Sequence, residues 1–216
     1  TAKALAEYPV GGLCYFSQNI TGSRQLRDLL SDTRKACEKV GAGVPPFLAV
    51  NEEGGKLVAR VANSGLFDVE RFPNMARVGA TNDVRQAAKV GSAIGTYLQD
   101  IGFNVDFAPV ADVLTNPANT VIGERSFGND PDLVARMVAS EIGAMLETGT
   151  LPCAKHFPGH GDTAGDSHTG AVCATRTREQ IETCELVPFR TAIDAGCPMV
   201  MVGHIETPNF APDGLP

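Results

Sequence analysis

Short apolar runs and longer amphipathic stretches alternate along the chain. The apolar runs predict five buried strands, at residues 10–16, 46–50, 105–108, 151–154 and 199–202. Between them, apolar positions recur at i, i+3 and i+4, which predicts helices over residues 23–40, 84–101, 131–148 and 178–195. Because Pro188 lies inside the last of these stretches, we expect that helix to be interrupted or kinked near it.

Continuous apolar strands that alternate with helices indicate parallel strands covered on both faces, and therefore the α/β class. Polar side chains follow four of the predicted strands, at Asn51, at Asp112, at Lys155 with His156, and over residues 204–206. A βα barrel with its site at the carboxyl ends of the strands predicts this placement. Neither the glycine pattern of a dinucleotide-binding fold nor that of a P-loop opens any of the helices, which argues against a nucleotide-binding domain.

The expected fold is therefore part of a TIM-type (β/α)8 barrel. Eight strand–helix units usually take about 250 residues, whereas this chain has 216 residues and shows five strands in its hydrophobic pattern. We expect residues 1–216 to form a single, partial barrel domain.

The composition narrows the choice of partners. The chain has 18 Lys and Arg against 25 Asp and Glu, for a net charge of -7, and shows no run of basic residues, so nucleic-acid binding is not expected. The sequence has no apolar stretch near the ~18 residues that cross a bilayer, so no membrane partner is expected. The six cysteines show no CxxC spacing and are interpreted as buried thiols of a cytosolic protein. We expect a cytoplasmic location, or a secreted or lipoprotein form if a leader has been removed.

The densest group of polar residues lies over residues 151–168, which hold three of the four histidines. Pro158 and three glycines are incompatible with a regular helix or strand from Phe157 onward, so an irregular loop is expected. His156 and His160 have the spacing of a metal-ligand pair on a helix. Because the residues between them break that helix, a metal site is not the favoured interpretation.

Two other interpretations of this loop remain. Gly159, Gly161 and His160 fit tight turns with a purely structural role. Asp166 and His168 fit a proton-transfer site, because a carboxylate two residues from an imidazole can fix its tautomer and raise its basicity. An Asp-x-His pair is common by chance, and its significance here comes from the nearby lysine and histidine at the strand end.

Further candidates lie at the other strand ends. A buried Lys155 needs a carboxylate or ligand oxygens to offset the cost of its charge. Arg125 has a planar guanidinium that suits a carboxylate or vicinal hydroxyls, and equally a surface ion pair. Glu52 and Glu53 fit either a catalytic pair or a solvated turn, and the two glycines that follow them favour the turn. Asp112 fits a cap or turn residue.

Several blocks of the sequence together resemble one family. Residues 155–163 (KHFPGHGDT), followed by 166–168 (DSH), strongly resemble the signature of family 3 glycoside hydrolases of the β-N-acetylglucosaminidase type. Residues 51–55 (NEEGG), 107–112 (FAPVAD) and 122–128 (IGERSFG) resemble other blocks of that family in the expected order. The resemblance covers nearly the whole chain. It implies a TIM-type barrel that removes terminal β-linked N-acetylglucosamine from peptidoglycan or chitooligosaccharide fragments with retention, without a cofactor or metal.

The resemblance also implies roles for single residues. His168 matches the general acid/base of the family, and Asp166 matches the aspartate that orients it. A near-neutral imidazole can protonate the leaving oxygen and then accept a proton from water. Lys155, His156 and Arg125 match positions that hold the hydroxyls of the sugar.

The chain departs from the family pattern in three places. Asn51 stands where an aspartate usually binds the sugar, so it can form hydrogen bonds but supplies no charge. Arg60 lies one position later than the family's arginine. We expect both Asn51 and Arg60 to bind substrate. The family's first strand precedes residue 10 and its nucleophilic aspartate follows a later strand. We therefore expect barrel strands two to six without the nucleophile, and a chain that is inactive alone.

Alternative functions follow from the same resemblance. A β-glucosidase or xylosidase of the family is one, although these generally lack the Asp-x-His loop. A phosphorylase is another, since a histidine acid/base does not repel phosphate as a carboxylate does. A non-catalytic sugar-binding fragment belongs to a different class, and its open barrel edges would favour self-association. A small carbohydrate is the expected partner in every case.

Overall fold

The computed structural model describes residues 2–40, 44–165, 170 and 172–210. The described part of the chain contains one five-stranded sheet in the order β1–β2–β5–β6–β8. These strands are β1 (Gly12–Tyr15), β2 (Phe47–Val50), β5 (Val105–Asp106), β6 (Leu151–Phe157) and β8 (Met199–Val202). Every neighbouring pair in this sheet is parallel, and the strands follow one another in chain order. The five predicted strands are confirmed, with β6 continuing to Phe157 instead of ending at residue 154.

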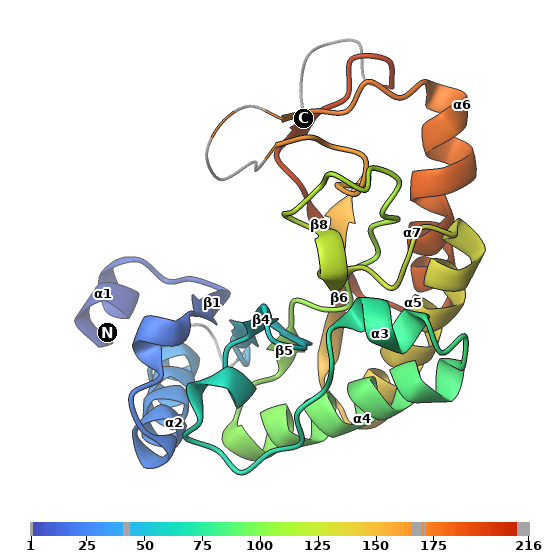
Figure 1. The fold of residues 1–216 in the computed structure, drawn as a ribbon. Coiled ribbons are helices and arrows are strands. Elements are labelled where there is room, and N and C mark those ends of the chain that lie inside the picture. The colour runs from blue at the N-terminus through green and yellow to red at the C-terminus, as the bar shows by residue number, and fades with distance from the viewer. Residues whose placement is uncertain (1, 41–43, 166–169, 171, 211–216) are drawn as a thin grey trace.

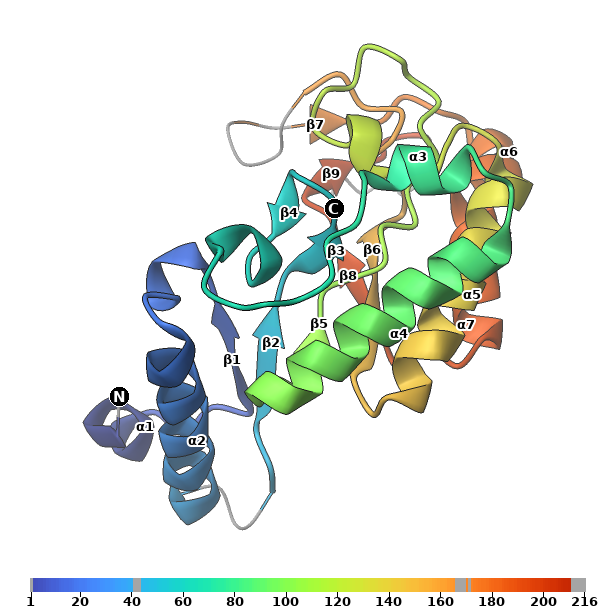
Figure 2. The same ribbon diagram turned by 60° about the horizontal axis from the view of Figure 1, so that its bottom comes forward.

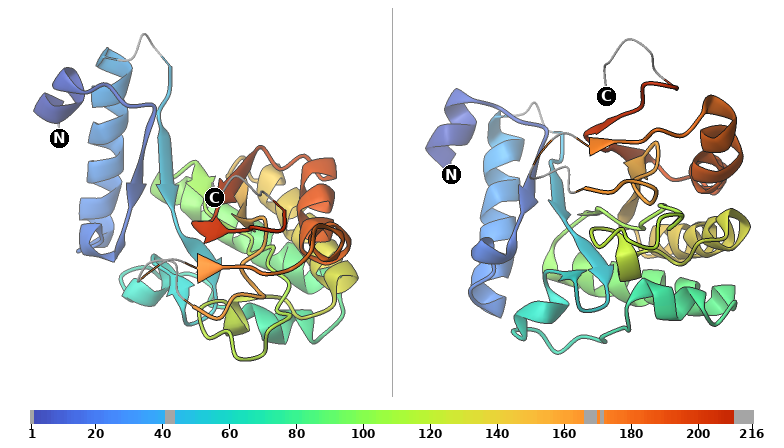
Figure 3. Two further views of the ribbon diagram at one scale, coloured as in Figure 1. Left: turned by 90° about the horizontal axis from the view of Figure 1, so that it is seen from above. Right: turned by 45° about the horizontal axis from the view of Figure 1, so that its top comes forward.

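Long helices follow the strands and cover the outside of the curled sheet, as Figures 1 and 2 show and as Figure 3 shows from two further directions. The helices are α2 (Ser23–Val40), α4 (Val84–Ile101), α5 (Pro131–Glu147) and a last helical stretch that begins with the short α6 (Arg178–Gln180) and ends with α7 (Leu186–Asp194). Connections between neighbouring parallel strands are nearly always right-handed, which places successive connecting helices on the same side of a sheet. The α/β class is confirmed, and the curled sheet is consistent with part of an α/β barrel.

The predicted interruption of the last helix lies just before Pro188. A π-helical turn, Ile181–Glu185, separates α6 from α7. Pro188 has no N–H to donate to the carbonyl of Cys184, four residues earlier. The N–H of Leu186 instead reaches the carbonyl of Ile181, five residues earlier. Glu185 is the last residue of this π-helical turn, which sets the direction of its side chain.

Smaller elements lie near the carboxyl ends of the strands (Figure 2). β3 (Glu52–Gly54) and β4 (Val58–Ala59) form an antiparallel hairpin, and β7 (Val172–Cys173) pairs in parallel with β9 (Ile205–Glu206). Outside these pairs are α1 (Ala2–Glu7), α3 (Met75–Gly79) and the short 3-10 helices η1 (Ser17–Asn19), η2 (Ala62–Ser64) and η3 (Gly123–Arg125). The hydrophobic pattern predicted neither strand of the β3–β4 hairpin.

The main hydrophobic core lies between the sheet and its helices. It includes Leu30 of α2, Leu48 of β2, Ile94 of α4, Phe103 before β5 and Ile142 of α5, each 1% exposed or less. These residues come from the apolar positions of the predicted strands and helices. This packing holds the strand ends in fixed relative positions.

The interpretation of the cysteines as buried thiols holds only in part. Cys37 and Cys153 are buried, whereas Cys173 is exposed and the other three are partly exposed. All six are free thiols. In the described residues, no helix has both the length and the apolar character needed to cross a bilayer.

Candidate functional site

The carboxyl ends of the sheet strands open onto one cavity of about 650 Å³. All five predicted substrate-binding residues line this cavity: Asn51, Arg60, Arg125, Lys155 and His156. Parallel strands end at one edge of a sheet, which is why residues far apart in the sequence meet there. The other two predicted site residues, Asp166 and His168, lie outside the described residues.

A bulge in β6 brings Lys155 and His156 to the same cavity. Consecutive side chains of a regular strand point to opposite faces. Lys155 pairs with Met201 and Phe157 pairs with Val202, so His156 is an extra residue in β6. The bulge reorients the backbone at this point, and both polar side chains line the cavity.

Glu53 binds two of the cations that line the cavity, Lys155 and Arg125. The ammonium of Lys155, 1% exposed, lies 2.5 Å from Oε1 of Glu53 and donates a hydrogen bond of 2.8 Å to Oδ1 of Asn51. Arg125 binds the same carboxylate through two atoms, with Nε 2.8 Å from Oε2 and Nη2 2.7 Å from Oε1. The carboxylate thus offsets the burial of Lys155 and fixes the plane of the guanidinium.

The charge state of Glu53 follows from these contacts. Burial acts to raise the pKa of its carboxyl, but the charges and hydrogen bonds of Lys155 and Arg125 outweigh it and lower the pKa. Glu53 is therefore an anion at neutral pH. Both of its oxygens are bound by cations, so it serves to position these two side chains.

Asp112 orients the imidazole of His156. Its Oδ2 lies 2.7 Å from Nδ1 of the ring, and its Oδ1 accepts hydrogen bonds from the backbone N–H groups of His156 and His160. A carboxylate at this distance places the proton on Nδ1, which leaves Nε2 to accept hydrogen bonds. Nη2 of Arg125 lies 3.5 Å from that Nε2. In the neutral ring, the proton of His156 therefore lies on Nδ1.

The same contacts keep Asp112 ionised. Complete burial acts to raise the pKa of its carboxyl, but the charge and hydrogen bond of His156 and the two backbone donors outweigh burial and lower the pKa. The sequence left Asp112 as a cap or turn residue. The structure instead pairs it with a side chain of the cavity.

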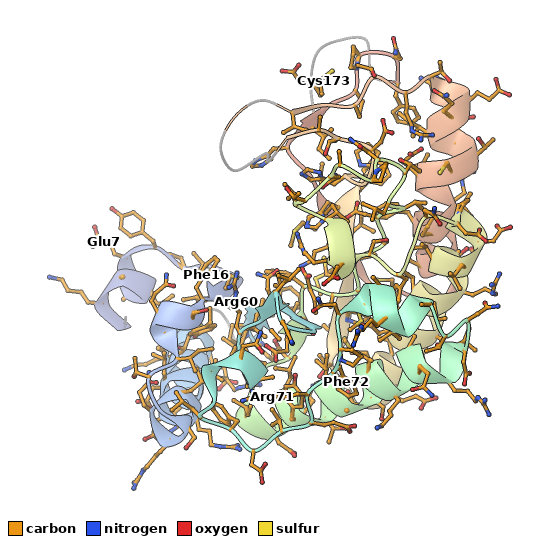
Figure 4. All side chains as sticks on the ribbon, viewed as in Figure 1. Glu7, Phe16, Arg60, Arg71, Phe72 and Cys173 are labelled. Carbon is orange, nitrogen blue, oxygen red and sulfur yellow. The ribbon has the colours of Figure 1, made fainter. Side chains whose placement is uncertain are left out.

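The β3–β4 hairpin carries Arg60 to the cavity beside Asn51. The N–H of Arg60 lies 3.3 Å from the carbonyl oxygen of Asn51, so the two residues face each other across the hairpin. A bulge at Glu53 lies between the paired residues Glu52 and Gly54. Nε of Arg60 is buried and has no hydrogen-bond partner among the described residues. Figure 4 labels Arg60 near Phe16, which lines the same cavity.

Glu52 has a structural task on the opposite side of the hairpin. Its carboxylate accepts hydrogen bonds from the N–H groups of Val61 and Ala62 and from the hydroxyl of Tyr97. Burial is the main reason that its pKa is raised. The preferred interpretation of Glu52 and Glu53 as a solvated turn is wrong, because both side chains are 2% exposed or less. The two glycines that follow them suggested a turn, so the burial of the two acids was not predicted.

His160 makes contacts with its neighbours in the loop that follows β6. Its Nδ1 lies 2.6 Å from the hydroxyl of Thr163, and its carbonyl accepts a hydrogen bond from Asn119. The rings of His156 and His160 meet edge to face, with centroids 5.8 Å apart. In the part of the chain that the structure describes, no three His, Cys, Asp or Glu side chains are grouped to hold a metal ion.

Comparison with known proteins identifies the family of this chain. The model of the glycosyl hydrolase family 3 N-terminal domain matches residues 1–216. The chain belongs to that family. The predicted resemblance is therefore confirmed at the level of the family.

Named relatives of this family 3 domain are β-hexosaminidases. The chain is 37% identical over 212 residues to β-hexosaminidase A of Pseudoalteromonas piscicida, covering 96% of this chain and 35% of that protein. Among solved structures, it resembles a family 3 β-N-acetylglucosaminidase from Paenibacillus sp. FPU-7, with a TM-score of 0.92 and 36% identity over 100% of this chain and 40% of the other. It also resembles NagZ from Neisseria gonorrhoeae in complex with N-trifluoroacetyl-D-glucosamine, with a TM-score of 0.86 and 29% identity over 100% and 62%.

The family 3 domain thus presents a cavity with fixed hydrogen-bonding groups. The cations Lys155, Arg125 and Arg60 supply donors, the amide of Asn51 supplies both donor and acceptor, and Nε2 of His156 supplies an acceptor. Among the described residues that line the cavity, Glu53 is the sole carboxylate. Such an arrangement can hold a hydroxyl-rich ligand in one orientation.

Proposed function

We propose that the protein to which these residues belong is a retaining glycosidase that removes terminal β-linked N-acetylglucosamine from peptidoglycan or chitooligosaccharide fragments. The observation that carries this proposal is the cavity at the strand ends, where residues matching the family's sugar contacts converge. Family membership and the β-N-acetylglucosaminidase neighbours support it. The domain covers 35% of its P. piscicida relative. We expect a complete TIM-type barrel in the parent protein.

In the proposed complex, the strand-end cluster binds the hydroxyls of the sugar. Lys155 and Arg125 are held by Glu53 before substrate arrives, so little side-chain entropy is lost on binding. Nε2 of His156 accepts from a hydroxyl, because Asp112 keeps the proton on the other ring nitrogen. Asn51 and Arg60 bind from the hairpin side.

Proton transfer is assigned to His168, oriented by Asp166, on the basis of the family motif. His168 protonates the leaving oxygen and then takes a proton from the attacking water. A retaining mechanism also needs a nucleophilic carboxylate. Glu53 is a poor candidate, because Lys155 and Arg125 bind both of its oxygens. We therefore assign the nucleophile to the rest of the parent protein and expect the 216-residue chain alone to be inactive.

The test compares the full-length protein with the 216-residue chain on paired chromogenic substrates. We expect the full-length protein to hydrolyse the N-acetylglucosaminide much faster than the glucoside, without need of phosphate, and the short chain to hydrolyse neither. Replacing His168→Asn should lower kcat/KM on a phenyl N-acetylglucosaminide by about 10²- to 10⁴-fold, the usual contribution of general acid catalysis.

Four results would contradict the proposal or a part of it. Preference for the glucoside would indicate a β-glucosidase, and dependence on phosphate would indicate a phosphorylase. Sugar binding without turnover by the full-length protein would indicate a binding function. Turnover by the short chain would overturn the assignment of the nucleophile to the rest of the protein.

A further inference from the structure

A second cavity, of about 290 Å³, adjoins the cavity at the strand ends. Arg60, which Figure 4 labels, lines both cavities and therefore lies at their junction. The second cavity receives side chains from η1, from the β3–β4 hairpin and from η2. Its lining residues are Ser17, Ile20, Lys56, Leu57, Ala59, Arg60, Asn63 and Ser64. We refer to it as the hairpin cavity.

Two cations and no acid stand among the described residues that line the hairpin cavity. Lys56 lies in the turn between β3 and β4, and Arg60 follows β4. In the described part of the chain, neither side chain forms an ion pair. Acids outnumber bases over the whole chain, which carries a net charge of -7. Two cations without anions around one cavity therefore create a local positive potential that favours an anionic ligand.

Arg60 differs in this respect from Arg125, the other arginine of the site. Arg125 is bound by both oxygens of Glu53. Nε of Arg60 is buried without a hydrogen-bond partner among the described residues, and its terminal nitrogens are not buried. A guanidinium without an acceptor is costly, and an oxyanion is the acceptor that matches its geometry best. The guanidinium of Arg60 is thus available to a ligand.

The nearest polar side chains of the hairpin do not neutralise Arg60. Glu53 binds other cations through both of its oxygens. The carboxylate of Glu52 accepts hydrogen bonds from two backbone N–H groups that follow Arg60 and from the hydroxyl of Tyr97. Asn51, whose carbonyl oxygen accepts a hydrogen bond from the N–H of Arg60, has an uncharged side chain. The positive charge of Arg60 therefore remains for the two cavities that it lines.

The backbone that carries Lys56 is fixed on both sides. Its N–H donates a hydrogen bond of 2.8 Å to Oδ1 of Asn74, and its carbonyl oxygen accepts one of 3.2 Å from the amide of Asn63. The preceding Gly55 packs so closely that an added Cβ would lie 2.6 Å from the same Oδ1 of Asn74. The turn of the hairpin is thus held in place, and the base of the Lys56 side chain stays at the cavity.

We propose that the hairpin cavity is an oxyanion subsite, which takes a phosphate or carboxylate group between Lys56 and Arg60. The guanidinium supplies paired donors, the ammonium supplies a point charge, and the hydroxyl of Ser17 adds a neutral donor. Because Arg60 lies at the junction, a sugar in the cavity at the strand ends can carry the anionic group. A free phosphate ion is the other source. The sugar-borne form rests on the proposed function, since it needs a sugar in the neighbouring cavity.

The experiment measures Kd for the full-length protein by titration calorimetry at low ionic strength. The ligands are N-acetylglucosamine, N-acetylglucosamine 6-phosphate, N-acetylmuramic acid, which carries a carboxylate, and inorganic phosphate alone. Each cation should contribute about two- to fivefold in affinity, the range for partly exposed ion pairs. At least one anionic sugar should therefore bind about four- to twentyfold more tightly than N-acetylglucosamine. Added salt should reduce this gain, because it screens exposed charges.

Lys56→Gln tests the subsite without changing a residue assigned to the neutral sugar. It should weaken binding of the favoured anionic ligand by about two- to fivefold and leave the Kd of N-acetylglucosamine unchanged. Lys56→Arg, which keeps the charge, should retain the gain. Lys39→Gln, an exposed change on α2 away from the hairpin cavity, is the matched control and should alter neither Kd. A merely structural role of Lys56 would instead weaken the neutral and anionic ligands alike.

The results distinguish the two sources of the anion. A gain for an anionic sugar that depends on Lys56 supports the sugar-borne group, and binding of inorganic phosphate alone that depends on Lys56 supports the free ion. If none of the three anions shows this dependence, the inference is overturned. If N-acetylglucosamine itself does not bind, the proposed function fails, and the titration with phosphate still tests the subsite. If N-acetylglucosamine binds and no anion is preferred, the inference alone fails.

Discussion

Two buried glutamates in this domain show opposite electrostatic behaviour. Glu53, at the strand ends, is an anion because Lys155 and Arg125 lower the pKa of its carboxyl despite burial. Glu141, on α5, is 1% exposed, and burial raises its pKa to about 8, with a further contribution from the charge of Glu53. Neither oxygen of Glu141 has a hydrogen-bond partner among the described residues. One acid stays charged because cations bind it, and the other stays neutral because none does.

The difference reflects what each region is built to do. At the strand ends, cations outnumber acids around the cavity, so a carboxylate there organises the binding groups. Between α4 and α5 the helices pack tightly, and a Cβ at Gly91 would lie 2.3 Å from the carbonyl oxygen of Glu141. The carboxyl of Glu141 lies in this interface without a hydrogen-bond partner among the described residues, and it is uncharged at neutral pH. A buried carboxyl is therefore charged at the site, where cations bind Glu53, and is protonated in the helix interface, where Glu141 lies.

Removing the charge of Glu53 should have the largest effect. Glu53→Gln leaves Lys155 and Arg125 without their anion, and breaking a buried pair from one side typically costs about 3–5 kcal/mol. The folded pKa of Glu53 is lowered, so its stabilisation is present above its unfolded pKa and is lost as pH falls through the folded value. Urea unfolding should show the difference between wild type and variant at neutral pH, and a smaller one in acid.

A matched control for this change is Glu70→Gln. Glu70 pairs with Lys89 at the surface, where both side chains are about half exposed. Exposed pairs contribute about 0–1 kcal/mol, so this variant should unfold nearly as the wild type does. If the two variants lose equal stability, the contrast between the buried ion pairs of Glu53 and the exposed ion pair of Glu70 is wrong.

Replacing Glu141 should have the opposite sign. Its folded pKa of about 8 lies above the ordinary value of 4.5, so the unfolded chain releases a proton that the folded chain keeps. Stability therefore falls as pH rises through this window. Glu141→Met removes the penalty and should add on the order of 3 kcal/mol near pH 8, and much less near pH 5.

The measurement is the midpoint of thermal or urea unfolding at both pH values. Glu147→Met, an exposed position on the same helix, is the control and should show no pH-dependent gain. A gain for Glu141→Met that is equal at the two pH values would mean that packing, and not the titration of the carboxyl, causes it.

The same contrast explains how far the sequence could predict the site. Lys155 and His156 stood out because polar residues rarely follow an apolar strand without a reason. The importance of Glu53 was missed, because its cations lie 72 and 102 positions further along the chain, at Arg125 and Lys155. Asp112 was ambiguous for the same reason. Periodicity reports which face of an element is buried, but it does not report which charges meet across strands.

The fold was predictable where local pattern decides it. The bounds of α2 and α4 match the predicted helices, because apolar periodicity and a following glycine set them. The β3–β4 hairpin was missed, since β3 is three residues long and begins with two glutamates, and β4 is only two residues long. Glu52, at the start of this hairpin, accepts a hydrogen bond from Tyr97, and no local sequence window contains both residues.

The smallest expected effect comes from adding an acid where cations are in surplus. Asn51→Asp places a second carboxylate beside Lys155, whose Nζ already lies 2.8 Å from Oδ1 of the amide. With Arg125 and Arg60 also lining the cavity, the new charge should cost less than about 1 kcal/mol of stability, unlike the unpaired Glu141.

In the full-length protein, the added charge should strengthen hydrogen bonds to sugar hydroxyls, because charge-assisted bonds are roughly twice as strong as neutral ones. We expect Asn51→Asp to lower KM for the N-acetylglucosaminide by about two- to fivefold with kcat nearly unchanged, since this contact is made in ground state and transition state alike. Asn63→Asp, an exposed change on η2, should alter neither constant. A higher KM or a destabilised domain in Asn51→Asp would show that Lys155 and Glu53 already balance the charge of the cavity, and that a further acid is tolerated there no better than in the core.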